Sequence, residues 1–418
     1  MRIAYLNSEY PSLSHTFIES EVRELRRLGV EIRTFSARST NQNGRLSKAH
    51  EAAAAETFVL QSGLLSLLRE TLIAALVSPL GFLRAIIHGQ RLATPGVASR
   101  VRHLAYVVQG VRLAREMARD ALQHVHVHMA NNGAAIAMMA CAYDRRRSYS
   151  LSIHGSDEFF HEETCALGPK VANARFVRCI SNFCRAQIMA WSHPSCWDRL
   201  HIVHCGVDPD LYKPSQAQRL GCLRLLTVGR LHPIKGYELL LRACALLAKE
   251  GLAWELNLVG DGPLLAHLQG LADLLGIQDR VIFSGAIGQD QIGAHFDRAD
   301  VMVVSSFMEG IPVVLMEAMS KRLAVVTTQV GGIVELVRNG IDGIYASPGS
   351  VESLANAIRP LAMQPSEAAK FGESARERVI EDFSVAGLGR GMLKLFTDTL
   401  SPPAPAAIET HDTDSLRE

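Results

Sequence analysis

Short apolar runs alternate with helix-like patterns along most of the chain. The runs that predict β-strands fall into two groups, separated by a polar stretch with two prolines. The first group comprises Arg2–Leu6, Val30–Phe35, His124–His128, Ser150–His154, Phe176–Ile180 and His201–His204. The second comprises Leu223–Val228, Glu255–Val259, Val281–Ser284, Val301–Ser305 and Ala324–Thr328. Several runs, such as Val281–Ser284 and Val301–Ser305, are almost entirely apolar and do not alternate, which is typical of strands that helices cover on both faces.

This alternation of strands and helices predicts two α/β domains, each a Rossmann-like, doubly wound parallel sheet. We predict a first domain over residues 1–207 and a second over 208–395, with the last helix packing back on the first domain. Residues 396–418 are predicted to form a disordered tail, because the segment from Ser401 onward is rich in proline and polar residues. Ligands of such sheets bind outside the carboxyl ends of the strands, so two facing domains predict a cleft between them.

Composition narrows the class of protein. The 418 residues exceed the usual size of one domain, and 48% hydrophobic with 20% charged residues is ordinary for a globular protein. Lys and Arg number 43 against 42 acidic residues, a net charge of +1 that argues against a nucleic-acid partner. The eight cysteines form no C-x-x-C pair, which indicates a reducing compartment and no zinc site.

The most apolar stretch, Thr71–Leu83, is interrupted by Pro79 and Gly81 and is shorter than the roughly 20 residues of a spanning helix. No signal-peptide pattern is visible at the start, so we expect a cytoplasmic protein. Residues 61–120 contain eight arginines and three acids, beside leucines at helical spacing. Two interpretations stay open: core helices with solvated arginines, or peripheral binding to an anionic membrane surface at the inner face of the cytoplasmic membrane.

The turn that begins at Gly229, after the predicted strand Leu223–Val228, carries two cations, Arg230 and Lys235, before Gly236 opens a helix. Cations and helix N–H groups at such a turn predict a phosphate site; a surface turn with solvated cations is the alternative. Further on, Glu309 follows a buried strand and Glu317 lies on the next helix. Carboxylates there would accept hydrogen bonds from sugar or ribose hydroxyls, or else serve as structural acids.

These positions belong to an ordered set of motifs: Gly-Arg-x4-Lys-Gly (229–236), Leu-Val-Gly-Asp-Gly-Pro (258–263), Glu-Gly-Ile-Pro (309–312), Glu-Ala-Met (317–319), Gly-Gly (331–332) and Asn-Gly-x-x-Gly (339–343). The set resembles the retaining family-4 glycosyltransferases. The Pro-x-Leu-Ser-x-Thr-Phe form of residues 11–17 resembles their exopolysaccharide and colanic-acid branch. One departure is Ser320–Val326, which lacks the family's usual Gly and Pro and places Arg322 at a helix-cap position.

The resemblance implies the two-domain GT-B fold, retention of anomeric configuration, and no cofactor or metal. Gly229, Arg230 and Lys235 would hold the donor diphosphate, and Glu317 would bind the ribose. Glu309, Gly310 and Ile311 would face the transferred sugar.

In the first domain, His154 ends a predicted strand, and the resemblance implies a histidine near the donor sugar there; a structural histidine is the alternative. We predict Ser12, Ser14, His128 and Asp157 on the acceptor side, with helix capping by Ser14 as its alternative role. The run His124–His128 puts three imidazoles on one strand face, but no carboxylate or cysteine lies near it in sequence. We therefore expect no metal site.

The sequence thus predicts a hexosyltransferase that moves a sugar from a UDP- or GDP-linked donor to a polysaccharide or polyprenyl-linked glycan. A nucleotide-sugar epimerase of the same architecture and a non-catalytic scaffold of a polysaccharide assembly complex remain alternatives. A NAD-dependent oxidoreductase is weaker, because Gly260-Asp-Gly262-Pro-Leu-Leu lacks the third glycine of the dinucleotide fingerprint.

Overall fold

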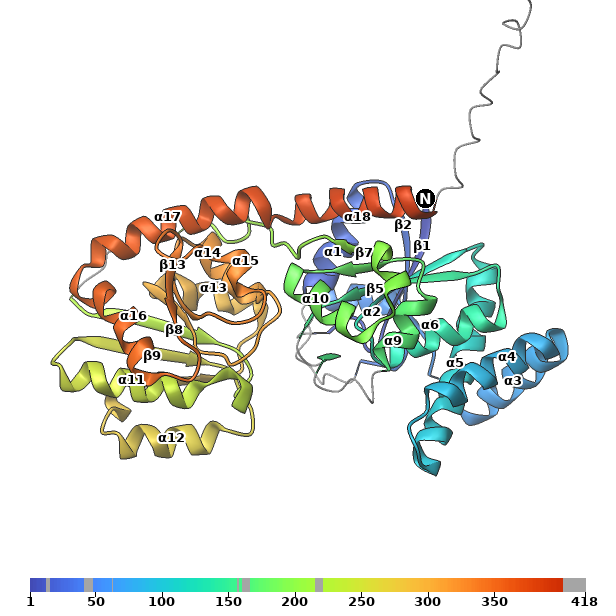
Figure 1. Cartoon of the computed structure of the whole chain (residues 1–418), viewed down its shortest axis with the longest axis horizontal. Helices are drawn as coiled ribbons and strands as arrows, with labels where there is room; N and C mark the ends of the chain where they lie inside the picture. Colours follow the sequence, from blue (N-terminus) through green and yellow to red (C-terminus); the bar gives the residue numbers. More distant parts are fainter. Residues whose placement is uncertain are drawn as a thin grey trace, which may run out of the picture.

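The computed structural model describes residues 1–12, 16–40, 48–61, 63–155, 158–159, 166–214 and 221–400. Two α/β domains lie side by side, and helices cover both faces of the sheet in each (Figure 1). Two helices near the end of the chain run along one side of both domains. This arrangement confirms the predicted fold class.

Within the described residues, the first domain contains a seven-stranded parallel sheet with the order β3-β2-β1-β4-β5-β6-β7. Its strands are β1 (Arg2–Asn7), β2 (Glu31–Ser36), β3 (Phe58–Val59), β4 (His124–His128), β5 (Ser148–Ile153), β6 (Val177–Cys179) and β7 (Leu200–Ile202). Its helices are α1 (Thr16–Arg27), α2 (Lys48–Glu56), α3 (Leu64–Val77), α4 (Pro79–Leu92), α5 (Val97–Arg119), α6 (Asn132–Tyr143), α9 (Leu167–Asn173) and α10 (Asn182–Trp191), with a short 3₁₀ helix, η1 (Pro194–Arg199).

The second domain contains a six-stranded parallel sheet with the order β10-β9-β8-β11-β12-β13, again within the described residues. Its strands are β8 (Leu223–Val228), β9 (Trp254–Val259), β10 (Val281–Gly285), β11 (Val301–Val304), β12 (Ala324–Thr328) and β13 (Gly343–Ala346). Its helices are α11 (Tyr237–Lys249), α12 (Leu265–Leu274), α13 (Gln289–Arg298), α14 (Val313–Ser320), α15 (Ile333–Leu336), α16 (Val351–Met363) and α17 (Pro365–Asp382), with 3₁₀ turns η2 (Pro233–Lys235) and η3 (Gln278–Arg280).

Each of the eleven strands predicted from apolar runs is present, with ends that differ by three residues or fewer. The two edge strands β3 and β13 were not predicted. The pairing of β3 covers only two residues, and β13 begins at a glycine directly after a turn, so neither shows an apolar run long enough to indicate a strand.

The chain crosses between the domains twice, and the two crossings are bonded to each other. Val207 donates its N–H to the carbonyl of Phe383, and Val385 donates to the carbonyl of Val207, at 3.0 and 2.7 Å. After the second crossing, α18 (Val385–Leu400) packs on α1 of the first domain. Phe396 on α18 is fully buried beside Tyr5. The predicted start of the disordered tail at residue 396 is therefore wrong, because residues 396–400 belong to this helix.

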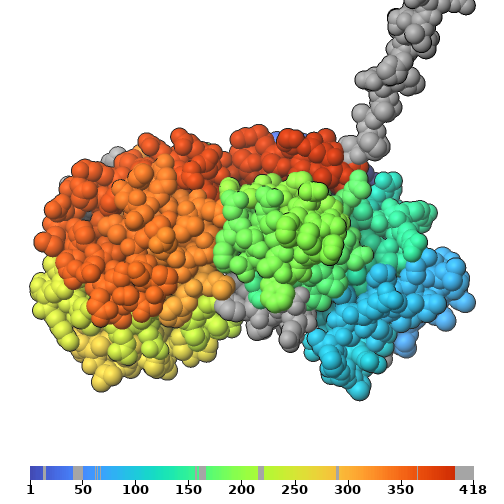
Figure 2. Space-filling model, viewed as in Figure 1, coloured from blue at the N-terminus to red at the C-terminus, as the bar shows by residue number. Residues whose placement is uncertain are grey.

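Helices α3, α4 and α5 extend from the first domain at the end that is far from the second domain (Figures 1 and 2). Among the described residues no single helix is long and apolar enough to cross a membrane. The stretches Leu67–Val77 and Pro79–Leu92 meet the length and composition criteria only when taken together, and they are bent by 118° where they join.

Candidate active site

A cavity of about 590 Å³ lies between the carboxyl ends of the two sheets. Strand-end loops of both domains line it, as the topology of open α/β sheets requires. The predicted site residues among its lining are His154, Gly229, Arg230, Lys235, Glu309, Gly310, Ile311 and Glu317. The structure therefore brings together positions that are up to 163 residues apart in the sequence, since His154 and Glu317 face the same space.

Lys235 ends the 3₁₀ turn η2, directly before α11. Gly236 then adopts a left-handed conformation with φ +63°, and a Cβ there would lie 2.2 Å from the carbonyl oxygen of Ser305. Ser305 also donates its hydroxyl to the carbonyl of Lys235 at 2.9 Å. This close approach, which only glycine permits, ties the loop after β8 to the loop after β11.

Glu309 is buried and accepts two hydrogen bonds on the same oxygen. Lys235 Nζ lies 2.6 Å from Glu309 Oε1, and the Ser306 hydroxyl donates to that oxygen at 2.6 Å. A Cβ on Gly331, which has φ +52°, would lie 1.9 Å from the Glu309 carbonyl oxygen. The position of Glu309 is thus fixed from both its side chain and its backbone.

Glu317 lies on α14, is 8% exposed, and accepts a hydrogen bond of 2.8 Å from the hydroxyl of Tyr212. Tyr212 belongs to the segment that joins the domains, and it is itself buried. A carboxylate that a hydrogen bond holds in place at the cavity wall is a suitable acceptor for a hydroxyl-bearing ligand.

His154 follows the carboxyl end of β5 and lines the cavity, where its ring contacts His128, Cys205 and Phe17. His154 Nε2 lies 2.8 Å from His128 Nδ1, and His154 Nδ1 lies 3.7 Å from Cys205 Sγ. The ring of Phe17 is 4.6 Å away. Across the domain boundary, a Cβ on Gly310 would lie 2.2 Å from the His154 carbonyl oxygen, so the two domains touch at this point.

Glu158 is a cavity residue that sequence reasoning missed. Its carboxylate accepts hydrogen bonds from the backbone N–H groups of His154 and Gly155, at 2.8 and 3.2 Å, and of Ala130. Burial raises the pKa of Glu158, while these N–H groups and Lys170 act in the opposite direction. The sequence does carry a signal for Glu158, because this acid lies only four residues after His154. The acid predicted at the site was its neighbour Asp157.

The acceptor-side predictions have mixed outcomes. His128 does not line the main cavity; it is buried behind His154 and borders a neighbouring cavity. Ser12 is buried and lines neither of these two cavities among the described residues. Ser14 and Asp157 lie outside the described residues.

The histidines of β4 do meet a carboxylate, because Glu21 of α1 lies over them. Ligand atoms of Glu21, His126 and His128 fall within 4.8 Å of one another. The carboxylate of Glu21 already accepts from Arg178 Nη1 at 2.7 Å, and both side chains are fully buried. A guanidinium in that position occupies the place of a cation, so the donor set fits an internal ion pair better than a metal ion.

The turn that departs from the family pattern is built without glycine. Arg322 follows α14 in the left-handed conformation, φ +62°. Leu323 donates its N–H to the Ala318 carbonyl at 3.1 Å and Arg322 donates to Met319 at 3.0 Å, which is the Schellman arrangement. The helix therefore ends as a glycine-capped helix would, with an arginine under backbone strain.

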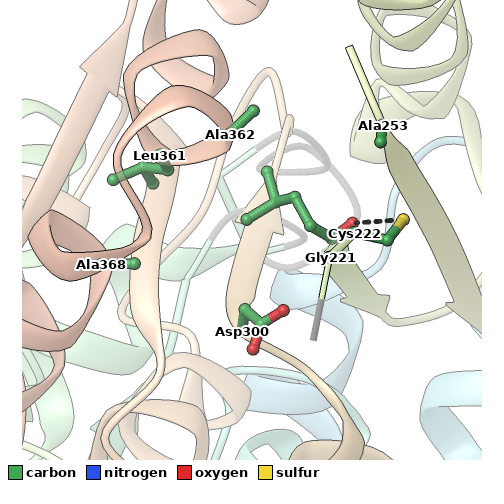
Figure 3. A pocket seen from close by; sticks show the side chains of 8 residues that line it. Gly221, Cys222, Ala253, Asp300, Leu361, Ala362 and Ala368 are labelled. Carbon is green, nitrogen blue, oxygen red and sulfur yellow. Dashed lines mark hydrogen bonds between the residues drawn. The ribbon is translucent and has the colours of Figure 1, made fainter. Parts of the chain in front are cut away.

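A second cavity, of about 140 Å³, lies at the amino ends of the strands of the second sheet (Figure 3). It lies beside Leu223 and Asp300, which stand at the amino ends of β8 and β11. Its other lining residues include Ala253, Ala362, Ala368 and Leu361 (Figure 3). The Asp300 carboxylate forms an ion pair with Arg224 at 2.8 Å. It is remote from the strand-end loops and takes no part in the site described above.

Two doubly wound domains that face each other across a cleft of strand-end loops define a GT-B protein. The sucrose-phosphate synthase of Thermosynechococcus elongatus has the same fold, with a TM-score of 0.74, 20% identity and coverage of 96% of this chain and 99% of that one. HepE of Anabaena, solved in complex with UDP-glucose, has a TM-score of 0.71 at 18% identity, over 95% and 100% of the two chains.

The family model described as glycosyl transferases group 1 matches residues 211–378, about two fifths of the chain, so the second domain is a group 1 glycosyltransferase domain. The amylovoran biosynthesis glycosyltransferase AmsK of Erwinia amylovora is 29% identical over 212 residues, 49% of this chain and 52% of that protein. The putative colanic acid biosynthesis glycosyltransferase WcaL of Escherichia coli K12 is 30% identical over 206 residues, 47% and 51% of the two chains. The chain thus spans about half the length of the curated relatives it matches. These findings confirm the predicted resemblance at the level of group 1 glycosyltransferases, with relatives in exopolysaccharide and colanic-acid synthesis, whereas the family-4 assignment stays a prediction.

Proposed function

We propose that the protein is a retaining glycosyltransferase of the family-4 kind, a hexosyltransferase that uses a nucleotide-sugar donor in the synthesis of an exopolysaccharide or cell-surface glycan. The observation that carries the proposal is the shared cavity: Arg230, Lys235 and the carboxylates of Glu309 and Glu317 face His154 of the other domain across it. Similarity to AmsK and WcaL supports the biosynthetic setting.

In this proposal the cations act electrostatically. Arg230 and Lys235 neutralise the diphosphate as it leaves, and the N-terminus of α11 adds to the positive potential. Glu317 takes the ribose hydroxyls, and Glu309 faces the transferred sugar. Charge neutralisation by side chains lets the chemistry proceed without a divalent metal, which is what we expect. A front-face departure of the diphosphate would retain the anomeric configuration.

The donor class is tested by thermal shift with UDP, GDP and ADP. A ligand at about 100 times its dissociation constant stabilises the folded state by about 2.7 kcal/mol, so one nucleotide should raise the melting temperature clearly above the others. Both a UDP and a GDP donor fit the proposal, since GDP-mannose-dependent mannosyltransferases of Mycobacterium tuberculosis are also similar to this chain, at 28% identity over 48% of it. Failure of all three nucleotides would refute it.

Two alternatives are separated by the fate of the donor. An epimerase converts the free nucleotide sugar without an acceptor, and a scaffold releases no nucleoside diphosphate under any condition. A glycosyltransferase releases nucleoside diphosphate in step with glycan extension. Assays with and without acceptor, which quantify nucleoside diphosphate and the epimeric donor sugar, therefore distinguish all three.

A polar cavity of about 410 Å³ next to the cleft supports an acceptor rich in hydroxyl groups. It shares Met129 with the main cavity and is also lined by Asn7, Ser8, Asn131 and Asn132. Both polar atoms of the Asn7 side chain are buried and lack a hydrogen-bond partner among the described residues. An unsatisfied buried amide is costly unless a ligand completes it, and sugar hydroxyls can both donate and accept. Asn7→Ala should raise the KM for acceptor and leave nucleotide binding unchanged.

We further propose that helices α3–α5 bind the anionic inner face of the cytoplasmic membrane and bring a polyprenyl-linked acceptor to the cleft. One face of these helices packs in the core through Ala74, Ala85 and Val107. The other exposes large apolar side chains: Leu65, Leu68, Leu72, Leu76, Val77, Leu80, Leu83, Ile87, Val97, Val101 and Leu104. Exposed Arg69, Arg91, Arg100 and Arg102 lie on the same helices. An apolar surface with arginines and few acids is suited to anionic lipid.

The membrane proposal is tested by co-sedimentation with vesicles of anionic or neutral lipid. We expect binding to anionic vesicles and its loss in a Leu76→Glu, Leu80→Glu double variant; these side chains are 74% and 72% exposed. Leu274→Glu is the matched control, because Leu274 is 82% exposed on α12 of the other domain. Equal, negligible binding of the wild type to both lipids contradicts the proposal.

A further inference from the structure

A continuous line of side chains runs from the core of the first domain to the cleft. Arg178 Nη1 donates to Glu21 Oε2 at 2.7 Å, and Glu21 Oε1 lies 3.3 Å from His128 Nε2. His128 Nδ1 lies 2.8 Å from His154 Nε2, and His154 Nδ1 lies 3.7 Å from Cys205 Sγ. Arg178, Glu21 and His128 are almost completely buried, so water does not compete for these contacts.

The charge of Glu21 determines which nitrogen of each histidine in this line carries a proton. Burial by itself raises the pKa of the Glu21 carboxyl, but the charge of Arg178 is the largest opposing influence and the pKa is lowered, so the group is ionised. The Tyr5 hydroxyl donates to Glu21 Oε1 at 3.0 Å as well. An ionised carboxylate repels a nitrogen lone pair, so His128 Nε2, which lies 3.3 Å from Glu21 Oε1, carries the proton.

The second nitrogen of His128 then has to accept. A doubly protonated His128 would add a cation beside Arg178 where one carboxylate is present, and the ring of His126, with its centroid 5.2 Å away, is held neutral because burial lowers its pKa. With His128 neutral, Nδ1 is unprotonated and His154 must donate to it through Nε2–H. At the far end, burial raises the pKa of the Cys205 thiol, whose S–H can donate to His154 Nδ1.

We infer that Glu21 and His128 are positioning residues that hold His154 in the neutral Nε2–H tautomer, with Nδ1 turned toward Cys205. His154 then lies in the cleft as an oriented, uncharged ring whose Nε2–H is donated to His128. It does not serve as a general base, because its accepting nitrogen faces a thiol of its own domain. Only the predicted effect on turnover rests on the proposed glycosyltransferase function.

The tautomer is measured directly by ¹⁵N spectra of the histidine rings in the full-length protein, assigned with a His154→Asn variant. We expect His154 to show a protonated Nε2 and an unprotonated Nδ1, unchanged between about pH 6 and pH 8. An Nδ1–H tautomer, or an imidazolium in that range, overturns the inference.

Two variants of His128 each remove one of its two contacts, either that with His154 or that with Glu21. The Gln side chain in His128→Gln reaches the Nε2 position and keeps the contact with Glu21, while the contact with His154 is lost. The Asn side chain in His128→Asn reaches the Nδ1 position and keeps only the contact with His154. We expect His154 to titrate in His128→Gln and to remain partly ordered in His128→Asn. His124→Asn is the control, because His124 bonds Ser148 and Ser150 and not His154.

Turnover supplies the second readout. Removing the outer partner of a metal-bound histidine typically lowers function about 10- to 100-fold. By analogy, kcat of His128→Gln should fall within that range while the donor KM stays within about twofold. An altered tautomer with unchanged kcat refutes the positioning role. Absence of transfer by the wild type with every donor would refute the proposed function alone, since the spectra decide the tautomer independently.

Discussion

The ammonium group of Lys235 lies 2.6 Å from the carboxylate of Glu309, and their loops are joined by the bond between Ser305 and the Lys235 carbonyl. The lysine side chain is 28% exposed and the carboxylate 11% exposed, so the pair stands at the cavity wall. An arriving diphosphate offers Lys235 a stronger partner, because it carries more negative charge and more acceptor oxygens. Donor binding would then release Glu309 to accept sugar hydroxyls.

Replacing Lys235 tests this exchange. Lys235→Ala should lower kcat by about 10²- to 10³-fold, the usual effect of removing one group that stabilises charge in the transition state. Folding should survive, since the Lys235 side chain is partly exposed and Glu309 keeps its hydrogen bond from Ser306. Steady-state kinetics and a thermal melt measure both. Lys249→Ala, at the exposed end of α11, is the control; near-normal turnover of Lys235→Ala contradicts the role in leaving-group stabilisation.

The left-handed backbone of Arg322 predicts a stabilising substitution. Glycine adopts φ near +60° without a Cβ clash, so Arg322→Gly should raise the free energy of unfolding by about 1 kcal/mol. The substitution also removes an exposed ion pair with Glu373, which contributes little. Arg322→Ala is the matched control: it loses the same ion pair and keeps the strain, so it should not stabilise. Urea unfolding curves compare the three proteins, and equal stability of the Gly and Ala variants contradicts the argument.

The sequence was sufficient for the two sheets and for the second domain's part of the site. The runs that became β8 and β11 are mostly apolar, and Arg230, Lys235 and Glu309 follow their carboxyl ends, where parallel topology forces side chains to converge. In this region the local order of the chain already determines which loops meet.

Partners that come from other elements could not be read from local patterns. Tyr212 of the interdomain segment contacts Glu317, and Glu21 of α1, which packs over β4, contacts His128. Nothing in the sequence near His128 indicates the carboxylate that covers it. The return of α18 to the first domain was anticipated, but its full length was not, because Phe396 is buried by residues almost 400 positions away.

The buried histidines of β4 predict a pH dependence of stability. Burial lowers the pKa of His124 to about 3, well below the ordinary value of 6.5. Between these two pH values the unfolded chain binds a proton that the folded protein does not, so stability must fall as the pH falls from 6.5 toward 3. One such histidine contributes a slope of about 1.4 kcal/mol per pH unit.

The measurement is urea unfolding between about pH 7.5 and pH 5, followed by the fluorescence of Trp191 and Trp197 in a Trp254→Phe background. In His124→Asn the slope on the acid side should decrease by about 1.4 kcal/mol per pH unit, whatever the absolute stability. The exposed His193 supplies the control substitution, His193→Asn, which should leave the slope almost unchanged. The same slope in His124→Asn and in the wild type would contradict a neutral, buried His124.

Glu335 of the second domain caps a helix of the first. Its carboxylate accepts hydrogen bonds from the backbone N–H groups of Asn182 and Phe183, at 2.8 and 2.9 Å, where α10 begins. The Asn182 side-chain amide donates to the same carboxylate at 2.9 Å. A negative charge at a helix N-terminus that also satisfies free N–H groups is worth about 1 kcal/mol. Because the bond crosses the domain boundary, this energy favours the closed arrangement in which Gly310 touches His154.

Glu335→Ala should therefore shift the protein toward a more open arrangement, seen as a larger radius of gyration in small-angle X-ray scattering, with a higher KM for the donor. About 1 kcal/mol corresponds to roughly a fivefold change in the ratio of closed to open molecules. Glu335→Gln keeps one acceptor oxygen and should have a smaller effect. Glu367→Ala removes a partly exposed acid that is paired with Lys370 within α17, and it should change neither quantity. If the scattering curves of Glu335→Ala and Glu367→Ala coincide, the cap does not hold the domains together.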